Sequence, residues 1–214
     1  MRLRNIPGAD EYLAKSAYMV QEPESVRGKW RQSFGKEVNA LELEIGCGKG
    51  RFITEKALSD PGTGFVGIEQ YSSVLYRRLK KLENEELPNL LFVRMNADRL
   101  AEVFGEGEAD RLYLNFSDPW PKDRHAKRRL TSRVYLDIYN RILAPGGVIE
   151  FKTDNENLFD FTLGELEPAG WKALEVCRNL YADPEALKGN VQTEYEEKFT
   201  LLNCPIYKCV IGRA

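Results

Sequence analysis

The stretch that decides the fold is Leu41-Glu42-Leu43-Glu44-Ile45-Gly46-Cys47-Gly48-Lys49-Gly50. Its first half alternates apolar and acidic residues, which is the period of a β-strand. Glycine then stands at every second position, where the chain must turn sharply and a ligand can come close to the backbone. A strand followed by a glycine turn that opens a helix is the context of a nucleotide or nucleoside site in an α/β sheet.

The same rhythm continues on both sides of this stretch. Short strands are predicted at residues 65–69, 91–95, 112–116, 148–152, 171–177 and 206–211, and helical spacing is found over 72–86 and 132–143. The last strand arrives without an obvious crossover helix, so it should be antiparallel. We therefore predict one α/β domain over residues 1–214, with a seven-stranded, mostly parallel sheet, an antiparallel C-terminal edge strand and helices on both faces.

Residues 1–38 are predicted to be an N-terminal arm that carries one short helix, at residues 11–20. Proline and glycine interrupt any longer element there. The arm is also expected to form part of the surface that contacts a nucleic acid.

Composition excludes several classes of protein. The chain has 214 residues, of which 43% are hydrophobic and 30% charged, enough for one globular core. No apolar run is long enough to span a membrane, and the first residues lack a secretory signal, so a cytoplasmic protein is expected. The four cysteines form no Cys-x-x-Cys pair and there is one histidine, so no metal is expected.

Charge is concentrated in one window. The whole chain carries a net charge of −2, but residues 119–133 contain six Lys or Arg and one acid. A generic polyanion binder is therefore disfavoured, and any contact with nucleic acid should be a local basic patch on an acidic body. Taken alone, such a run could equally be a solvated surface.

Glu69 ends the second predicted strand, 23 residues after Gly46, where a carboxylate can bind a ribose diol. Dinucleotide sites favour Gly-x-Gly-x-x-Gly, whereas Gly46, Gly48 and Gly50 are evenly spaced and follow an acid, Glu44, that would repel phosphate. The cationic cofactor S-adenosylmethionine fits this turn better. Asn96, after the third strand, could reach the adenine or could cap the next helix.

The fourth strand leads into Asp118-Pro119-Trp120-Pro121-Lys122-Asp123-Arg124-His125-Ala126-Lys127-Arg128-Arg129. It ends at the carboxyl edge of the sheet, where α/β folds bind ligands, so Asp118 should emerge beside the transferable methyl group. Prolines restrict the backbone around Trp120, and the cationic run follows at once. A carboxylate, a large aromatic ring and a phosphate-binding segment therefore share one loop.

At these residues the chain resembles the bacterial tRNA (guanine-N7)-methyltransferase family, a group of Rossmann-like class I enzymes that depend on S-adenosylmethionine. The motifs are Glu-Ile-Gly-x-Gly-x-Gly, Asp-Pro-Trp-Pro-Lys-x-Arg-His-x-Lys-Arg-Arg, Phe-Lys-Thr-Asp and Thr-x-Tyr-Glu, with Arg2-Leu3-Arg4-Asn5 in the arm. The resemblance implies S-adenosylmethionine at Glu44, Glu69, Asn96 and Asp118. It implies that tRNA meets Lys122, Arg124, His125, Ala126, Lys127, Arg128, Arg129, Asp154, Thr193, Glu194, Tyr195 and Glu196. Some relatives carry Asp in place of Asn96.

The family's target is a guanine in the tRNA variable loop, and elementary chemistry fits that target. Guanine N7 has an in-plane lone pair, so it can attack a sulfonium methyl without losing a proton. Asp118 is then expected to position the guanine N1–H and N2–H edge and to stabilise the cationic purine, while Trp120 stacks on the base.

Other interpretations stay open at this point. An exocyclic-amine methyltransferase would show Asp/Asn-Pro-Pro and an aromatic residue, and a pyrimidine C5 enzyme would use a Pro-Cys pair, which Cys204-Pro205 reverses. An RNA-binding module that senses the cofactor without turnover is a further alternative. Thr193 and Glu196 also form a capping box, and Asp154-Asn155 could cap a helix. A homodimer is compatible with the sequence.

Overall fold

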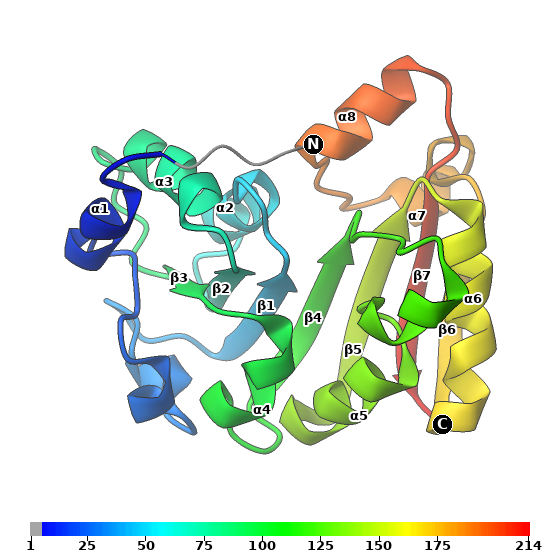
Figure 1. Cartoon of the computed structure of the whole chain (residues 1–214), viewed down its shortest axis with the longest axis horizontal. Coiled ribbons are helices and arrows are strands. Elements are labelled where there is room, and N and C mark those ends of the chain that lie inside the picture. The colour runs from blue at the N-terminus through cyan, green and yellow to red at the C-terminus, as the bar shows by residue number, and fades with distance from the viewer. Residues whose placement is uncertain (1–5) are drawn as a thin grey trace.

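The computed structural model describes residues 6–214 and has a seven-stranded sheet at its centre, in the order β3-β2-β1-β4-β5-β7-β6 (Figure 1). The first five strands in the chain are parallel to one another. The predicted mostly parallel α/β sheet is confirmed. The strands are β1 (Ala40–Ile45), β2 (Thr63–Glu69), β3 (Leu90–Arg94), β4 (Ala109–Asn115), β5 (Leu143–Thr153), β6 (Trp171–Cys177) and β7 (Tyr207–Arg213).

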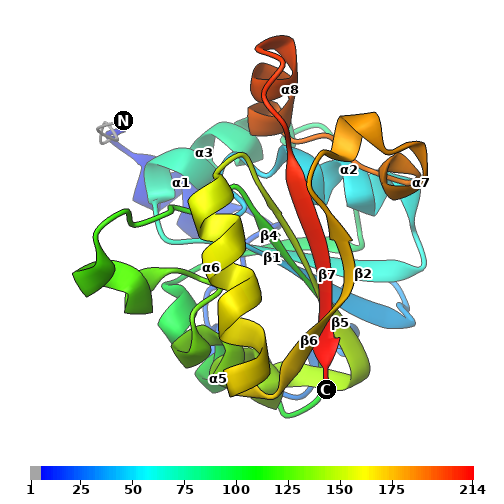
Figure 2. The ribbon, with the colours of Figure 1, turned by 90° about the vertical axis from the view of Figure 1, so that its right-hand side faces the viewer.

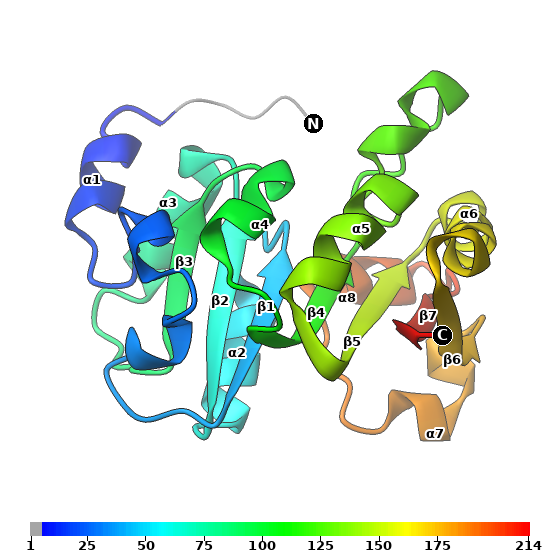
Figure 3. The ribbon, with the colours of Figure 1, turned by 90° about the horizontal axis from the view of Figure 1, so that it is seen from below.

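The described chain has eight α-helices, of which α1 to α6 lie on the two faces of the sheet, as predicted (Figures 2 and 3). Helices α1 to α3 pack on one face through a cluster that includes Leu13, Ile53 and Leu79, whereas α4 to α6 pack on the other. The helices are α1 (Ala9–Lys15), α2 (Arg51–Ser59), α3 (Ser72–Lys81), α4 (Leu100–Val103), α5 (Arg133–Ile142), α6 (Glu156–Leu166), α7 (Pro184–Leu187) and α8 (Glu194–Leu201).

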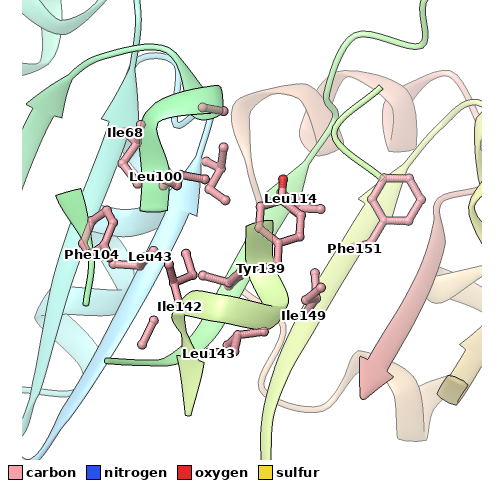
Figure 4. Close-up of a cluster of buried hydrophobic side chains, with 14 of the residues drawn as sticks. Leu43, Ile68, Leu100, Phe104, Leu114, Tyr139, Ile142, Leu143, Ile149 and Phe151 are labelled. Carbon is pink, nitrogen blue, oxygen red and sulfur yellow. The ribbon is translucent and has the colours of Figure 1, made fainter. Parts of the chain in front are cut away.

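Strand periodicity divides the core between the two faces. In β2, Phe65 points into the cluster with α2 and α3, while Val66 and Ile68 point into the cluster with α4 and α5. Figure 4 shows the second cluster, where Tyr139 and Ile142 of α5 meet the central strands. Strand β2 is buried along its whole length because helices cover both of its faces, and the carboxyl ends of the five parallel strands lie at one edge of the sheet.

The C-terminal strand β7 is antiparallel, as predicted, and pairs Ile211 with Ile149 of β5. The prediction that it forms the edge of the sheet is wrong, because it lies between β5 and β6, and β6 is the edge strand. The burial of the two strands agrees with this strand order. Cys209 and Ile211 of β7 are fully buried, whereas Leu174 of β6 is 50% exposed.

Two predicted helices are shorter than expected. The helix predicted over 72–86 ends at Lys81, because the following Glu83, Glu85 and Glu86 would place negative charge at a helix C-terminus. The arm helix predicted over 11–20 ends at Lys15. The chain beyond it pairs with β3 instead, through a parallel bridge between Met19 and Phe92.

The rest of the arm packs on the domain. Trp30 is fully buried, and its indole N–H donates to the Val103 carbonyl at 2.9 Å. The Glu108 carboxylate accepts from the backbone N–H groups of Gly28 and Trp30 at 2.9 and 2.8 Å. The motif Arg2-Leu3-Arg4-Asn5 lies outside the described residues. Over residues 6–214, none of the helices has the length and apolar character that crossing a membrane requires.

Candidate cofactor and nucleic-acid site

The glycine turn presents bare backbone at the carboxyl end of β1. Gly46, Gly48 and Gly50 have φ values of 74°, 56° and 65°, a region that disfavours other residues. At Gly46 and Gly48 an added Cβ would meet no atom within 4 Å, whereas at Gly50 it would lie 2.9 Å from the Phe92 ring. The first two glycines therefore leave room for a ligand, and the third lets helix α2 start close to β3.

Glu69, at the end of β2, is tied to this turn. Its Oε2 accepts from the Gly48 N–H at 3.1 Å, and its Oε1 accepts from the N–H groups of Gln70 and Tyr71 at 2.8 and 3.0 Å. Burial raises the pKa of Glu69, and the negative charge of Asp118 adds to the rise. The three backbone N–H donors act in the opposite direction and lower the pKa. The arrangement orients a carboxylate at the mouth of the turn and brings Asp118 into its electrostatic range.

Glu44 is the second carboxylate of the turn and is only 3% exposed. Its Oε1 accepts from Asn115 Nδ2 at 2.9 Å, and its Oε2 has no hydrogen-bond partner within residues 6–214. Burial raises the pKa of Glu44 to about 7. An orphaned, buried carboxylate oxygen beside an open glycine turn fits a cationic ligand and disfavours a pyrophosphate.

Asn96 follows β3 at the same edge of the sheet. It is exposed, and the neighbouring Met95 N–H donates to the Glu69 carbonyl at 3.2 Å. The alternative that Asn96 caps the next helix is wrong, because its side chain makes no capping bond to the described chain. Its amide is therefore available to a ligand held by the glycine turn.

The loop after β4 has an unusual backbone. Phe116 and Trp120 have positive φ values of 52° and 42°, which few side chains adopt without support from their surroundings. Asp118 lies between them and is exposed. The loop therefore holds Asp118 at the carboxyl edge of the sheet, as predicted.

Arg129 supplies much of that support. Its Nε and Nη2 donate to the carbonyls of Pro119 and Trp120, each at 3.0 Å, and its guanidinium lies 4.2 Å from the Phe161 ring centroid. It is only 9% exposed. Two of its five N–H donors therefore bond within the loop, and a contact of Arg129 with tRNA stays a prediction.

The remaining cations of the run stay on the surface. Residues 123–128 form a short 3-10 helix, in which His125 and Ala126 are half-buried. The His125 ring meets Trp120 edge-on, and the Arg128 guanidinium lies 4.9 Å from the centroid of the Trp120 ring. A base could stack only on the part of the Trp120 ring that His125 and Arg128 do not cover. The exposed cations are Lys122, Arg124, Lys127 and Arg128.

Glu196 of α8 was expected to meet tRNA, but it is fully buried. Its Oε2 accepts from Lys152 Nζ at 2.8 Å and from the Thr193 N–H at 3.2 Å, while Glu196 N–H donates to Thr193 Oγ1 at 3.0 Å. The predicted capping box is confirmed. Both side chains therefore serve the protein interior, which corrects their assignment to the substrate.

Helix α8 stands above the carboxyl ends of β4 and β5 (Figure 1). Glu194 pairs with Lys49 of the glycine turn at 2.5 Å, and Glu197 pairs with Arg51 at 2.7 Å. Tyr195 is 59% exposed and stacks with Phe116 at a centroid distance of 6.2 Å. Of the residues 193–196, Tyr195 and Glu194 are thus the ones that face the mouth of the site.

Asp154 follows β5 and is half-buried. The helix after it is capped by Asn155, whose Oδ1 accepts from the Leu158 N–H at 2.8 Å. The capping alternative therefore holds for Asn155, and Asp154 is left at the same sheet edge as Asp118.

Sequence reasoning missed three residues that build the site. Asn115 Nδ2 donates to Glu44, Lys152 Nζ donates to Glu196, and Arg78 Nε donates to the Lys49 carbonyl at 2.5 Å. A charged residue inside an otherwise apolar strand, as in Phe151-Lys152-Thr153, is a signal for a buried ion pair. Across the described residues, no group of three or more His, Cys, Asp or Glu could hold a metal.

The fold is that of the methyltransferases. A solved structure described as an antibiotic-related methyltransferase superposes with a TM-score of 0.64 and 18% identity, covering 100% of this chain and 97% of that one. Residues 38–209 match the family described as "Putative methyltransferase".

Relatives with much higher identity define the family more narrowly. A tRNA (guanine-N(7)-)-methyltransferase of Lachnoclostridium phytofermentans is 48% identical over 213 residues, which are 100% of this chain and 99% of that protein. One of Bacillus licheniformis is 44% identical over 97% of both chains. The chain belongs to the tRNA (guanine-N(7)-)-methyltransferase family.

Proposed function

We propose that the protein transfers a methyl group from S-adenosylmethionine to N7 of a guanine in the tRNA variable loop. The observation that carries the proposal is the meeting of an acid-lined glycine turn and the Asp118 loop at one edge of the sheet. The relatives named above supply the identity of the base. Since tRNA is the substrate, we place the enzyme in the cytoplasm, and a homodimer stays a prediction.

The cofactor would lie across the carboxyl ends of β1, β2 and β3. Glu69 would accept from the ribose hydroxyls, because each of its oxygens has lone pairs beyond those used by the backbone. Asn96 would meet the adenine, and Gly46, Gly48 and Gly50 would leave space for the chain of the nucleoside. When bound, S-adenosylmethionine supplies an electrophilic methyl group on a sulfonium.

Asp118 would act on the guanine. N7 attacks with its own lone pair, so no base has to remove a proton before the N–C bond forms. The Asp118 carboxylate can accept from N1–H and N2–H, which fixes the ring, and its negative charge favours the cationic purine that develops. Alignment of N7 with the methyl group should supply most of the rate.

The tRNA backbone would meet the exposed cations of the loop after β4. Lys122, Arg124, Lys127 and Arg128 form a local positive surface on an acidic protein, and phosphates are bound by such charges with little regard to sequence. Asp154, Glu194 and Tyr195 border the same mouth. We expect the arm to extend this surface.

The proposal is tested by incubating the protein with methyl-labelled S-adenosylmethionine and unmodified tRNA and then identifying the labelled nucleoside. We expect label in N7-methylguanosine at one variable-loop position. Label in an exocyclic amine would indicate another RNA base N-methyltransferase. Binding of both ligands without label would indicate a cofactor-sensing RNA-binding module.

A further inference from the structure

Cations of the glycine turn, of α2 and of α3 gather beside the proposed cofactor mouth. We call them the α2–α3 cluster, which consists of Lys49, Arg51, Arg78 and Lys81. A groove of about 330 Å³ between the two helices is lined by Arg51, Arg78 and Lys81 and by two acids, Glu55 and Glu85. Arg78 Nε donates to the Lys49 carbonyl at 2.5 Å, which connects the turn to α3. The α2–α3 cluster is a second basic surface, distinct from the loop after β4.

The first turn of α8 places two acids against this cluster. Glu194 Oε2 pairs with Lys49 Nζ at 2.5 Å, and Glu197 Oε2 pairs with Arg51 Nη1 at 2.7 Å. Residues three apart lie on one face of a helix, so both carboxylates meet the cluster together. Partial burial alone would raise the pKa of Glu194, but its bond to Lys49 and the charges of Lys49 and of the two α3 cations lower it. The two carboxylates therefore occupy cations that an anionic ligand could bind.

One buried ion pair and two partly exposed ones connect α8 to the rest of the protein. Within Glu194–Leu201, Glu196 is the one buried residue, and its carboxylate accepts from Lys152. Leu201, at the other end, is 80% exposed, and the helix projects beyond the sheet (Figures 1 and 2). The two pairs with the α2–α3 cluster are partly exposed, and such pairs add little to stability. They can be exchanged for pairs with another anion while the buried pair keeps α8 attached.

The α2–α3 cluster and the loop after β4 lie on different sides of the proposed mouth. Helices α2 and α3 pack on one face of the sheet, whereas that loop leads into α5 on the other. Figure 2 shows the loop and α2 on opposite sides of α8. A nucleotide that is turned out of its stack has a phosphate on its 5′ side and another on its 3′ side. Both flanks of the target guanine therefore need cations, and the loop after β4 supplies them on one flank.

We propose that the α2–α3 cluster binds tRNA phosphates on the second flank of the target guanine, and that these phosphates replace the two α8 carboxylates. The inference rests on the proposed function and adds to it a further contact surface and a competition. In the free protein, Glu194 and Glu197 neutralise cations that tRNA needs, so they oppose tRNA binding. The exchange breaks two ion pairs within the protein and forms phosphate–cation pairs in their place.

The first test is the dependence of tRNA affinity on salt, measured by filter binding. Lys49→Ala and Lys81→Ala should each weaken binding and lower the slope of log K against log salt by about one, because each removes a phosphate contact. Arg31→Ala is the matched control and should leave the slope unchanged. Arg31 is also a partly exposed, ion-paired cation, but its partner Asp110 lies near the start of β4, at the opposite edge of the sheet. Unchanged slopes in both lysine variants would overturn the phosphate surface.

The second test is the sign of the effect of Glu194→Gln on tRNA affinity. If Glu194 competes with phosphate, tRNA should bind about two- to fivefold more tightly, since a partly exposed ion pair opposes binding by no more than that. Glu106→Gln removes the same charge from an exposed position just before β4, and it should change the affinity less. Weaker binding in Glu194→Gln would show a direct contact with RNA and overturn the competition. An equal gain in both variants would reduce the effect to net charge and overturn it as well.

The inference and the proposed function fail in different ways. Formation of N7-methylguanosine together with unchanged salt slopes would overturn the inference and leave the proposed function in place. Lowered slopes in the lysine variants without methyl transfer by the unmodified protein would overturn the proposed function and leave the phosphate surface. If the unmodified protein binds no tRNA, both are wrong.

Discussion

The two sides of the proposed site differ in charge and in burial: one has buried carboxylates, and the other has exposed cations. On the cofactor side, Glu44 and Glu69 are buried, bonded to neighbouring protein groups and raised in pKa. On the tRNA side, the cations of the loop after β4 are exposed, apart from Arg129. Burial makes the first side sensitive to pH and to single hydrogen bonds, while exposure makes the second sensitive to salt.

The same contrast divides two adjacent residues of one basic run. Arg128 is exposed, with its guanidinium over Trp120, and Arg129 is buried and bonded to two carbonyls of the loop. Two adjacent arginines therefore have different roles: Arg128 lies on the surface, and Arg129 stabilises the interior of the loop. Substitutions on each side of the site test whether burial and exposure separate these roles.

The largest effect is expected for Asp118→Ala, at the boundary between the two sides. Turnover should fall by about a thousandfold or more, because the guanine loses its positioning carboxylate, while cofactor affinity should stay within about tenfold. Single-turnover methylation and calorimetry measure the two quantities. Asp123→Ala, an exposed acid of the same loop, is the control and should change turnover little. Undiminished turnover in Asp118→Ala would remove its assigned role.

The next effect concerns the ion pair that fixes α8. Lys152 and Glu196 are both fully buried, so Lys152→Ala leaves an uncompensated charge and should lower the free energy of unfolding by about 3–5 kcal/mol. Chemical denaturation measures this. The matched control, Lys49→Ala, breaks the exposed pair with Glu194 and should cost about 1 kcal/mol or less. Similar losses in the two variants would contradict the contrast between buried and exposed pairs.

Arg129→Ala should act on the shape of the loop. Turnover is expected to drop by about 10- to 100-fold, because Pro119 and Trp120 lose the donors that hold their carbonyls and Asp118 shifts with them. The dependence of tRNA affinity on salt should not change. A lowered salt slope would instead place Arg129 among the phosphate ligands.

Arg128→Ala should show the smallest effect and the opposite pattern. Affinity for tRNA should fall and the slope of log K against log salt should decrease by about one, with turnover at saturating tRNA little altered. Filter binding at several salt concentrations measures the slope. An unchanged slope would assign Arg128 to solvated surface or to its contact with Trp120 alone.

Most of the fold could be predicted because strand periodicity and glycine turns are local properties of the chain. The strand at 171–177 was predicted to its ends, and the turn at Gly46 to Gly50 was placed correctly. The arm could not be predicted in this way, because Met19 pairs with Phe92 and Trp30 packs against Val103, both contacts between distant parts of the sequence.

The site was predicted less evenly. The position of Asp118 followed from the end of a strand. The burial of Arg129 and Glu196 could not be read from a charge pattern, because a cation that binds a carbonyl and one that binds a phosphate look the same in sequence. The role of Asn115 was missed for a similar reason, because it depends on one hydrogen bond to Glu44 that the sequence does not reveal.

The central claim is that cofactor and guanine meet at the carboxyl ends of β1, β2 and β4, and a crystal structure with S-adenosylhomocysteine tests it most directly. We predict the adenosine between Glu69 and Asn96, the amino-acid end at Glu44, and the sulfur facing Asp118. A ligand bound elsewhere, such as in the groove lined by Phe52, Lys56, Tyr113 and Lys208, with the glycine turn empty, would contradict the account.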